Sequence, residues 1–125
     1  MIIEHVHLQI KADQSLEFEQ AFQQAKEIIY PMSGLNAVQL IKNINDDHRY
    51  ILMIFWDQLE DHTEGFRTSE GYQQWKTLLH PFYDPQPEVE YYQPCMMLMN
   101  GHRRTCRSLQ LVLKSVIHMR SLWNL

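Results

Sequence analysis

The feature of this sequence that most constrains its fold is the apolar run from Tyr50 to Trp56, YILMIFW. Its seven residues suit a strand better than a helix. A run without polar breaks is typical of a strand that is covered on both faces. We therefore expect a central strand here, with other parts of the chain packed on either side of it.

Segments with strand-like and helix-like periodicity surround this run. The predicted elements are a strand over 2–10, a helix over 14–29 with Asp13 or Ser15 as N-cap, a strand over 35–43, the strand over 50–56, a helix from 58 to about 79 that bends near 68–71, and a strand over 89–93. With a hairpin between the second and third strands, this order predicts an α+β fold of the ferredoxin-like split βαβ class, with an antiparallel four-stranded sheet and two main helices.

One face of such a sheet has no helix to cover it. Apolar side chains of the central strand would then face water, which a soluble protein avoids. Two copies can cover these side chains by stacking their sheets face to face about a two-fold axis. We therefore expect a homodimer that forms through the sheet faces.

Charge divides the chain into two parts. Residues 1–95 carry 15 acidic against 6 basic side chains, and residues 96–125 carry 5 basic side chains and no acidic one. An acidic main body does not suit nucleic-acid binding, so no nucleic-acid partner is expected.

The chain has no apolar run long enough to span a membrane and no signal-peptide pattern at its start. Cys95 and Cys106 lack a Cys-x-x-Cys spacing, which favours free thiols in the cytoplasm.

The basic segment 96–125 is interpreted as an extension to a domain of residues 1–95. Its apolar residues recur at helical spacing, which predicts a basic amphipathic helix over about 105–122 that packs on the acidic domain. The loss of all acidic residues leaves three interpretations open: an extra helix, a packing arm, or out-of-frame coding sequence.

The residues with the most chemical potential lie between Phe55 and Trp75. His62 falls on the apolar face of its predicted helix, where a neutral imidazole could accept a proton from a phenol or quinol. It could equally be a packed histidine that is hydrogen-bonded to backbone. The aromatic residues Trp56, Tyr72, Trp75 and Tyr83 could line a pocket for a flat ligand, although aromatic residues at helical spacing are more often core.

Arg67 could bind an anionic substrate oxygen, or it could pair with Glu64 or Glu70 in the same helix. His5 and His7 share one strand face, but no third ligand stands at motif spacing, so no metal site is predicted. His7 is kept as a candidate substrate contact. The sequence has no glycine-rich phosphate loop and no hydrolase elbow, so nucleotide cofactors and acyl-enzyme chemistry have no support.

Several of these residues form a recognisable pattern. It comprises Phe55-Trp56, Leu59-Glu-Asp-His62, Gly65-Phe66-Arg67, Ser69, Tyr72, Trp75 and Val89-Glu-Tyr-Tyr92. With the order of elements, the pattern resembles the antibiotic biosynthesis monooxygenase family over about residues 1–95. The resemblance implies a dimeric α/β barrel that oxidises a small aromatic or quinol-type molecule with oxygen and without a cofactor. If the protein is such an oxygenase, the predicted catalytic residues are His62, Trp56 and Tyr72, and the predicted substrate contacts are Phe66, Arg67, Trp75 and Tyr83.

The sequence departs from the family patterns at three places. Phe66 stands where many members have a histidine three residues before the serine, and Glu70-Gly71 stands where they often have Pro-His. The first strand also lacks the asparagine of a haem-degrading branch. Two functions therefore remain open: a cofactor-free oxygenase, and a non-catalytic small-molecule-binding or stress-response protein with the same pocket.

Overall fold

The computed structural model describes residues 1–98 and 100. The elements, in chain order, are β1 (Ile2–Gln9), α1 (Ser15–Ile29), β2 (Leu35–Lys42), β3 (Arg49–Trp56), the π-helix η1 (Asp61–Phe66), α2 (Glu70–Leu79), the 3-10 turn η2 (His80–Phe82) and β4 (Val89–Tyr92). Residues Met1–Gln93 form one compact unit. The helix predicted over about 105–122 lies outside the described residues.

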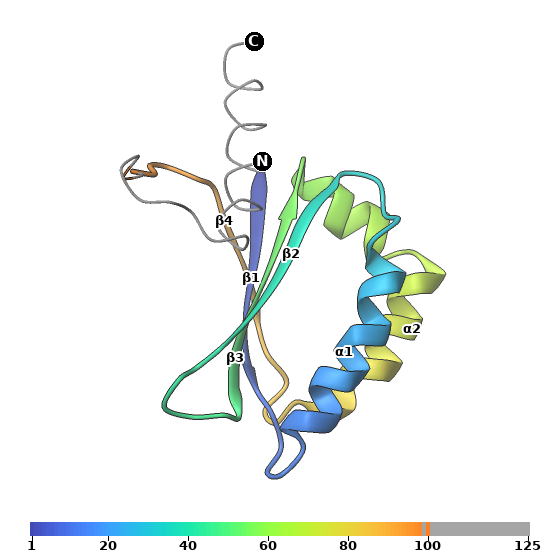
Figure 1. The fold of residues 1–125 in the computed structure, drawn as a ribbon. Helices are drawn as coiled ribbons and strands as arrows, with labels where there is room; N and C mark the ends of the chain where they lie inside the picture. Colours follow the sequence, from blue (N-terminus) through green and yellow to red (C-terminus); the bar gives the residue numbers. More distant parts are fainter. Residues whose placement is uncertain (99, 101–125) are drawn as a thin grey trace. The chain divides into compact units, whose positions relative to one another are not determined.

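The four strands form one antiparallel sheet in the order β2-β3-β1-β4. Both α-helices pack on the same face of this sheet (Figure 1). This arrangement confirms the predicted α+β ferredoxin-like fold, with the apolar strand β3 at its centre.

Within one chain, β3 is covered on one of its two faces. Alternate residues, such as Leu52, Ile54 and Trp56, are buried, whereas Met53 and Phe55 are only partly buried. The first set faces the helices, and we call this side of the sheet the covered face. The continuous apolar run of β3 therefore contains both buried core residues and residues that are partly accessible on the opposite face of the sheet.

The core lies between the covered face and the helices. Phe18, Ala25 and Ile29 of α1 are fully buried there, as is Leu79 of α2. These α1 residues recur at spacings of seven and four, so a single stripe of the helix meets the sheet. Burial of the larger side chains among them, Phe18, Ile29 and Leu79, is worth roughly 1.5–3 kcal/mol each before the entropy cost.

The predicted N-cap of α1 is wrong. Gln14 holds the cap position and makes no side-chain cap hydrogen bond. Asp13 has a positive φ of 61° in the preceding turn, and the Ser15 hydroxyl donates to the carbonyl of Asp47. The Ser15 side chain thus joins α1 to the β2–β3 hairpin rather than capping the helix.

The helix predicted over 58–79 is divided, as expected, but its first part has π geometry. The N–H of Arg67 donates to the carbonyl of His62, an i to i+5 bond of 2.9 Å. Helix α2 then begins after Ser69, whose side chain accepts a hydrogen bond from the N–H of Tyr72. The break therefore coincides with an N-cap serine.

The turn before β2 leads to a prediction about stability. Gly34 has a φ of +80°, and a Cβ atom there would lie 2.1 Å from Oδ2 of Asp61. That carboxylate accepts a hydrogen bond from the N–H of Gln58 at the approach to η1. We expect Gly34→Ala to lower the free energy of unfolding by at least about 1–2 kcal/mol, the cost of a side chain in left-handed backbone.

Gly65→Ala is the matched control for this experiment. A Cβ atom at Gly65 would meet its nearest neighbour at 3.8 Å, an ordinary contact. Urea unfolding should therefore give Gly65→Ala a stability equal to or slightly above that of the parent. Equal stabilities for the two alanine variants would contradict this account of Gly34.

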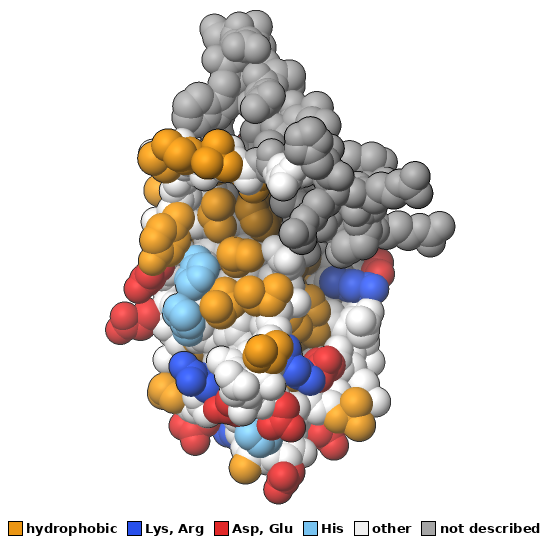
Figure 2. Space-filling view, turned by 60° about the vertical axis from the view of Figure 1, so that its left-hand side comes forward, with side chains coloured by type: hydrophobic (Ala, Val, Ile, Leu, Met, Phe, Trp, Pro, Cys, Tyr) orange, Lys and Arg blue, Asp and Glu red, His pale blue; other side chains and the backbone are white. Residues whose placement is uncertain are grey.

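The face of the sheet opposite the helices carries an apolar surface, which we call the open face. Its residues are Ile3, His5, His7 and Gln9 of β1, Ala37, Gln39 and Ile41 of β2, Ile51, Met53 and Phe55 of β3, and Glu90 and Tyr92 of β4. Figure 2 shows hydrophobic side chains gathered over this face with histidines among them. Among the described residues, no helix is both long enough and apolar enough to cross a bilayer.

Candidate functional site

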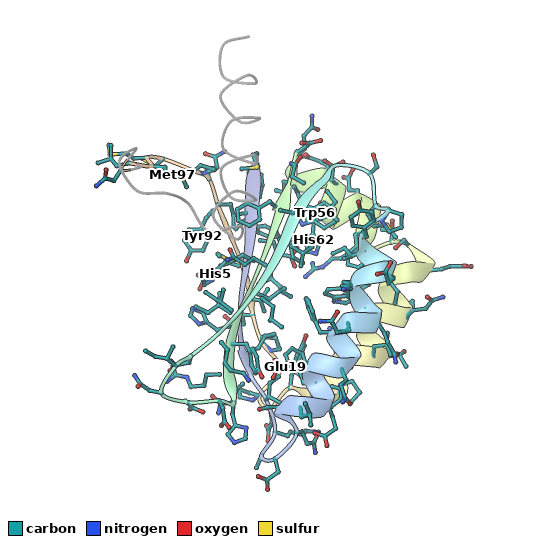
Figure 3. All side chains as sticks on the ribbon, in the orientation of Figure 1. His5, Glu19, Trp56, His62, Tyr92 and Met97 are labelled. Carbon is teal, nitrogen blue, oxygen red and sulfur yellow. The ribbon has the colours of Figure 1, made fainter. Side chains whose placement is uncertain are left out.

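The candidate site is centred on His62, in the π-helix η1. This segment presents both His62 and Phe66 to the covered face, where their side chains are buried. The rings of His62 and Trp56 lie 5.7 Å apart between their centroids. Figure 3 shows both residues on the helix side of the sheet. The geometry therefore brings together two residues that the sequence predicts to share a site.

A buried carboxylate, Glu4, lies beside this pair. Its side chain occupies an inward position of β1 and is 5% exposed. Its Oε2 accepts a hydrogen bond of 2.9 Å from the indole N–H of Trp56. Its Oε1 lies 3.3 Å from Nε2 of His62. Each carboxylate oxygen thus has one specific neighbour.

Tyr91 completes the arrangement from the edge strand β4. Its hydroxyl lies 2.6 Å from Nδ1 of His62, at hydrogen-bond distance. Tyr91 is directly opposite Glu4 in the β1–β4 register, so both side chains are on the covered face. The result is a continuous chain of polar groups, Trp56–Glu4–His62–Tyr91, which crosses the end of the sheet. We call it the polar chain.

Burial shifts the pKa values of the two inner ionisable groups toward their neutral forms. The pKa of Glu4 rises to about 7, mainly because burial penalises the carboxylate; the Trp56 hydrogen bond and the charge of Arg67 act in the opposite direction. The pKa of His62 falls to about 4, through burial and then through the charge of Arg67. At neutral pH the imidazole is therefore uncharged, and Glu4 is close to half-ionised.

Phe66 packs against most of the predicted aromatic wall. Its ring contacts those of Trp56, His62, Tyr72 and Trp75, with centroid separations between 5.4 and 6.4 Å. Phe66 is 2% exposed and Trp56 is fully buried. The residues converge as the sequence predicts, but Phe66 occupies the space beside His62. A flat ligand could contact Trp56 only if Phe66 moved.

The other predicted site residues are placed as follows. Arg67 is exposed, and the ion pairs found among residues 1–98 and 100 include neither of its predicted partners, Glu64 and Glu70. Its charge instead acts on Glu4 and His62. Tyr83 is buried and contacts Phe18, and burial and the charge of Glu4 raise the pKa of its hydroxyl.

His7 lies on the opposite face of the sheet from His62 and the other residues of the candidate site. It lies on the open face, in a hollow of about 550 Å³ beside the β2–β3 hairpin that is also lined by Lys42 and Arg49. Its ring packs against that of His5, 4.8 Å away. Within the described part of the chain, no group of three potential metal ligands is present.

Sequence reasoning missed two members of the polar chain, Glu4 and Tyr91. The available signal for Glu4 was a single carboxylate at an inward position of β1, between Ile2 and Val6. Buried carboxylates are rare unless they are paired, so this break in the alternation pointed to a partner. Tyr91 is recognisable only once the register of β4 against β1 is known.

Comparisons with known proteins agree with this fold. The antibiotic biosynthesis monooxygenase family matches residues 1–78. The uncharacterized protein YczJ of Bacillus subtilis (strain 168) is 50% identical over 93 residues, which are 74% of this chain and 98% of that protein. A structure from Bordetella bronchiseptica that carries the family's name has a TM-score of 0.72 and 25% identity, and covers 76% of this chain and 97% of that one.

A more distant structure shares the fold alone. SnoaB from Streptomyces nogalater, a cofactor-independent oxygenase, superposes with a TM-score of 0.70 at 14% identity, over 79% of this chain and 97% of its own. The family match and the half-identical relative both span most of the compact unit Met1–Gln93. The chain therefore belongs to the antibiotic biosynthesis monooxygenase family.

Proposed function

We propose that this protein is a cofactor-independent monooxygenase that acts on a small aromatic or quinol-type molecule. The observation that supports this most directly is the buried imidazole of His62, which contacts both a carboxylate and a tyrosine hydroxyl and whose pKa is lowered by burial. Such an imidazole can pass on a proton in a site from which water is excluded. The likeness to SnoaB adds support at the level of the fold.

The proposed reaction needs a base and a dry site rather than a metal or flavin. Removal of a proton from an anthrone-type substrate gives an electron-rich anion, which transfers an electron to oxygen. Recombination forms a carbon–oxygen bond, and loss of water from the peroxide leaves a carbonyl. One oxygen atom enters the product and the other leaves as water, so the CH₂ group of the substrate supplies all four electrons. The exposed cation of Arg67, which already acts on Glu4 and His62, suits the substrate oxyanion.

Oxygen uptake with a panel of quinols and anthrones tests this proposal. We expect His62→Ala to lower the rate about 100-fold or more, the usual contribution of a positioned acid–base group. His48→Ala is the control, since His48 lies at the β2–β3 hairpin and bonds to Ser15. A wild-type rate equal to the rate without protein would refute the oxygenase proposal.

The packing of Phe66 favours a second candidate, a non-catalytic binding or stress-response protein. Phe66 is 2% exposed and contacts the rings that would hold a flat substrate. In that case calorimetry would detect binding of an anthraquinone to the parent protein without any oxygen uptake, and Phe66→Ala, which enlarges the space beside His62, would tighten that binding. Uptake by the parent protein would exclude this candidate.

We also propose a homodimer that forms through the open face, located in the cytoplasm. The open face carries partly buried Met53 and Phe55 and the half-exposed Tyr92. Side chains of this kind are usually covered in a stable protein. An interface between two stacked sheets of this kind would bury about 2,000 Å² or more of accessible surface in total.

A further inference from the structure

The polar chain has one end that a substrate could reach. Trp56 is fully buried, His62 is 3% exposed and Glu4 is 5% exposed, whereas Tyr91 is 37% exposed at the edge strand β4. Phe66 and Trp56 close the opposite side through their ring contact. A molecule that does not displace the core therefore meets the hydroxyl of Tyr91 first.

His62 is poorly suited to keep a proton that it receives. Its ring lies against the apolar rings of Trp56 and Phe66, and the charge of Arg67 further disfavours the imidazolium. Glu4 lies on the far side of the ring, and burial raises the pKa of its carboxyl group to about 7. An imidazole between a hydroxyl and a carboxylate can accept a proton at one nitrogen while it releases another from the second.

From this geometry we propose that Tyr91 is the catalytic residue that contacts the acidic hydrogen of the substrate, and that Glu4 is the final proton acceptor, reached through His62. This inference rests on the proposed function and changes the position of the substrate. The substrate's acidic O–H or C–H lies at the edge of β4, against Tyr91, rather than against Trp56. The substrate class is a molecule with a phenol-like or enol-like proton.

The proton transfers balance at every atom. Initially Glu4 is a carboxylate, His62 carries its proton on Nε2, and the Tyr91 hydroxyl donates to Nδ1. The substrate gives its proton to the Tyr91 oxygen, the original Tyr91 proton moves to Nδ1, and the Nε2 proton moves to Oε1 of Glu4. The substrate becomes an anion, Glu4 becomes neutral, and His62 has changed only its tautomer.

Other ionisable groups near the polar chain affect this balance. Arg67 in the segment between η1 and α2 lowers the pKa of Tyr91 and of Glu4. Burial, the leading cause, raises the pKa of Tyr91, and the charges of Glu4 and of Tyr72 from α2 act in the same direction. Tyr83, which follows η2, responds to the same Glu4 charge. Burial brings the pKa of Glu4 to about 7, so Glu4 is the group whose ionisation the following test detects.

The first test is nitrogen NMR of histidine-labelled protein between pH 5 and 9, which requires no substrate. We expect the His62 ring to change from the Nδ1–H to the Nε2–H tautomer as pH rises through about 7 and to remain neutral. Glu4→Gln should hold the ring in the Nδ1–H form, because its amide donates to Nε2. An imidazolium in this range, or one fixed tautomer in the parent protein, would overturn the proton path.

The second test compares Tyr91→Phe with Tyr92→Phe. Tyr92 is the adjacent residue of β4, but its hydroxyl bonds to Glu90 on the open face. With anthrone and oxygen, Tyr91→Phe should lower kcat about 100-fold, while Tyr92→Phe stays within about twofold of the parent. In the parent protein, kcat should rise with pH through about 7, because only the ionised Glu4 can accept the proton. Glu4→Gln should remove this rise.

Failure of the inference and failure of the proposed function give different results. If Tyr91→Phe turns over as fast as the parent, Tyr91 is not the contact residue, although the protein is an oxygenase. If the parent protein consumes no oxygen, the oxygenase function fails, and the position of the substrate is then tested with 1-naphthol. Its binding should shift the ring signals of Tyr91 in labelled parent protein, and signals that do not move would overturn the inference.

Discussion

Glu4→Gln is expected to change how the stability of the protein depends on pH. Burial raises the folded-state pKa of Glu4 to about 7 from 4.5. A raised carboxyl pKa gives a stabilising contribution that is complete below the unfolded value and is lost as pH rises through the folded one. The parent protein should therefore lose up to about 3 kcal/mol from this group between pH 4.5 and 8. Glutamine resembles the neutral acid and does not ionise, so the variant should gain on the parent as pH rises.

Urea unfolding at several pH values measures this difference, with Glu19→Gln as the control. Glu19 on α1 accepts hydrogen bonds from Lys42 and Tyr50, and the first of these holds its pKa below the usual value. Glu19 should therefore show the opposite sign: its contribution is present above its unfolded pKa and is lost in acid. A Glu4→Gln difference that does not vary with pH would mean that Glu4 ionises normally.

Met53→Asp is expected to prevent dimerisation. Met53 lies at the centre of the open face on β3, opposite His5 of β1 and Gln39 of β2. In the proposed dimer, a two-fold axis would bring two such aspartates into one apolar interface, where unpaired charges cost several kcal/mol. We expect the dimer dissociation constant to rise more than about 100-fold, because each 1.4 kcal/mol is a factor of ten.

Sedimentation equilibrium at micromolar concentration checks this result. Gln24→Asp adds the same charge at an exposed position of α1, away from the sheet, and should leave the dimer intact. A parent protein that sediments as a monomer would refute the dimer. A Met53→Asp dimer as tight as the parent would place the interface on another surface.

The fold could be predicted because the apolar pattern of its strands and helices repeats within short stretches of the sequence. Alternation predicts β1, and apolar residues at helical spacing predict α1, within one or two residues of the observed bounds. The π geometry of η1 could not be predicted, since one displaced hydrogen bond leaves little trace in an apolar pattern. The family resemblance supplied the topology with greater specificity than periodicity alone.

The candidate site was predictable only in part. His62 and Trp56 were expected to meet, and their rings lie 5.7 Å apart. Glu4 was missed because one carboxylate in a strand gives no periodic signal, and its hydrogen-bond partner Trp56 is 52 residues away. Tyr91 was missed because its role depends on strand pairing. Long-range pairs of this kind are fixed by the register of the sheet rather than by any local motif.

The position of His62 depends on the number of residues in the π-helix η1 more than on the identity of those residues. Each residue added to or removed from an α-helix turns everything beyond it by about 100° relative to the part that stays fixed, and the wider π turn gives a somewhat smaller rotation of the same kind. With α2 held by its N-cap at Ser69, a one-residue deletion between His62 and Phe66 would leave the strands paired but rotate His62 away from Glu4. Thr63 and Glu64 are not part of the polar chain, and Glu64 is exposed. Relatives that keep the polar chain should therefore tolerate substitutions at these two positions far better than an insertion or deletion between His62 and Ser69.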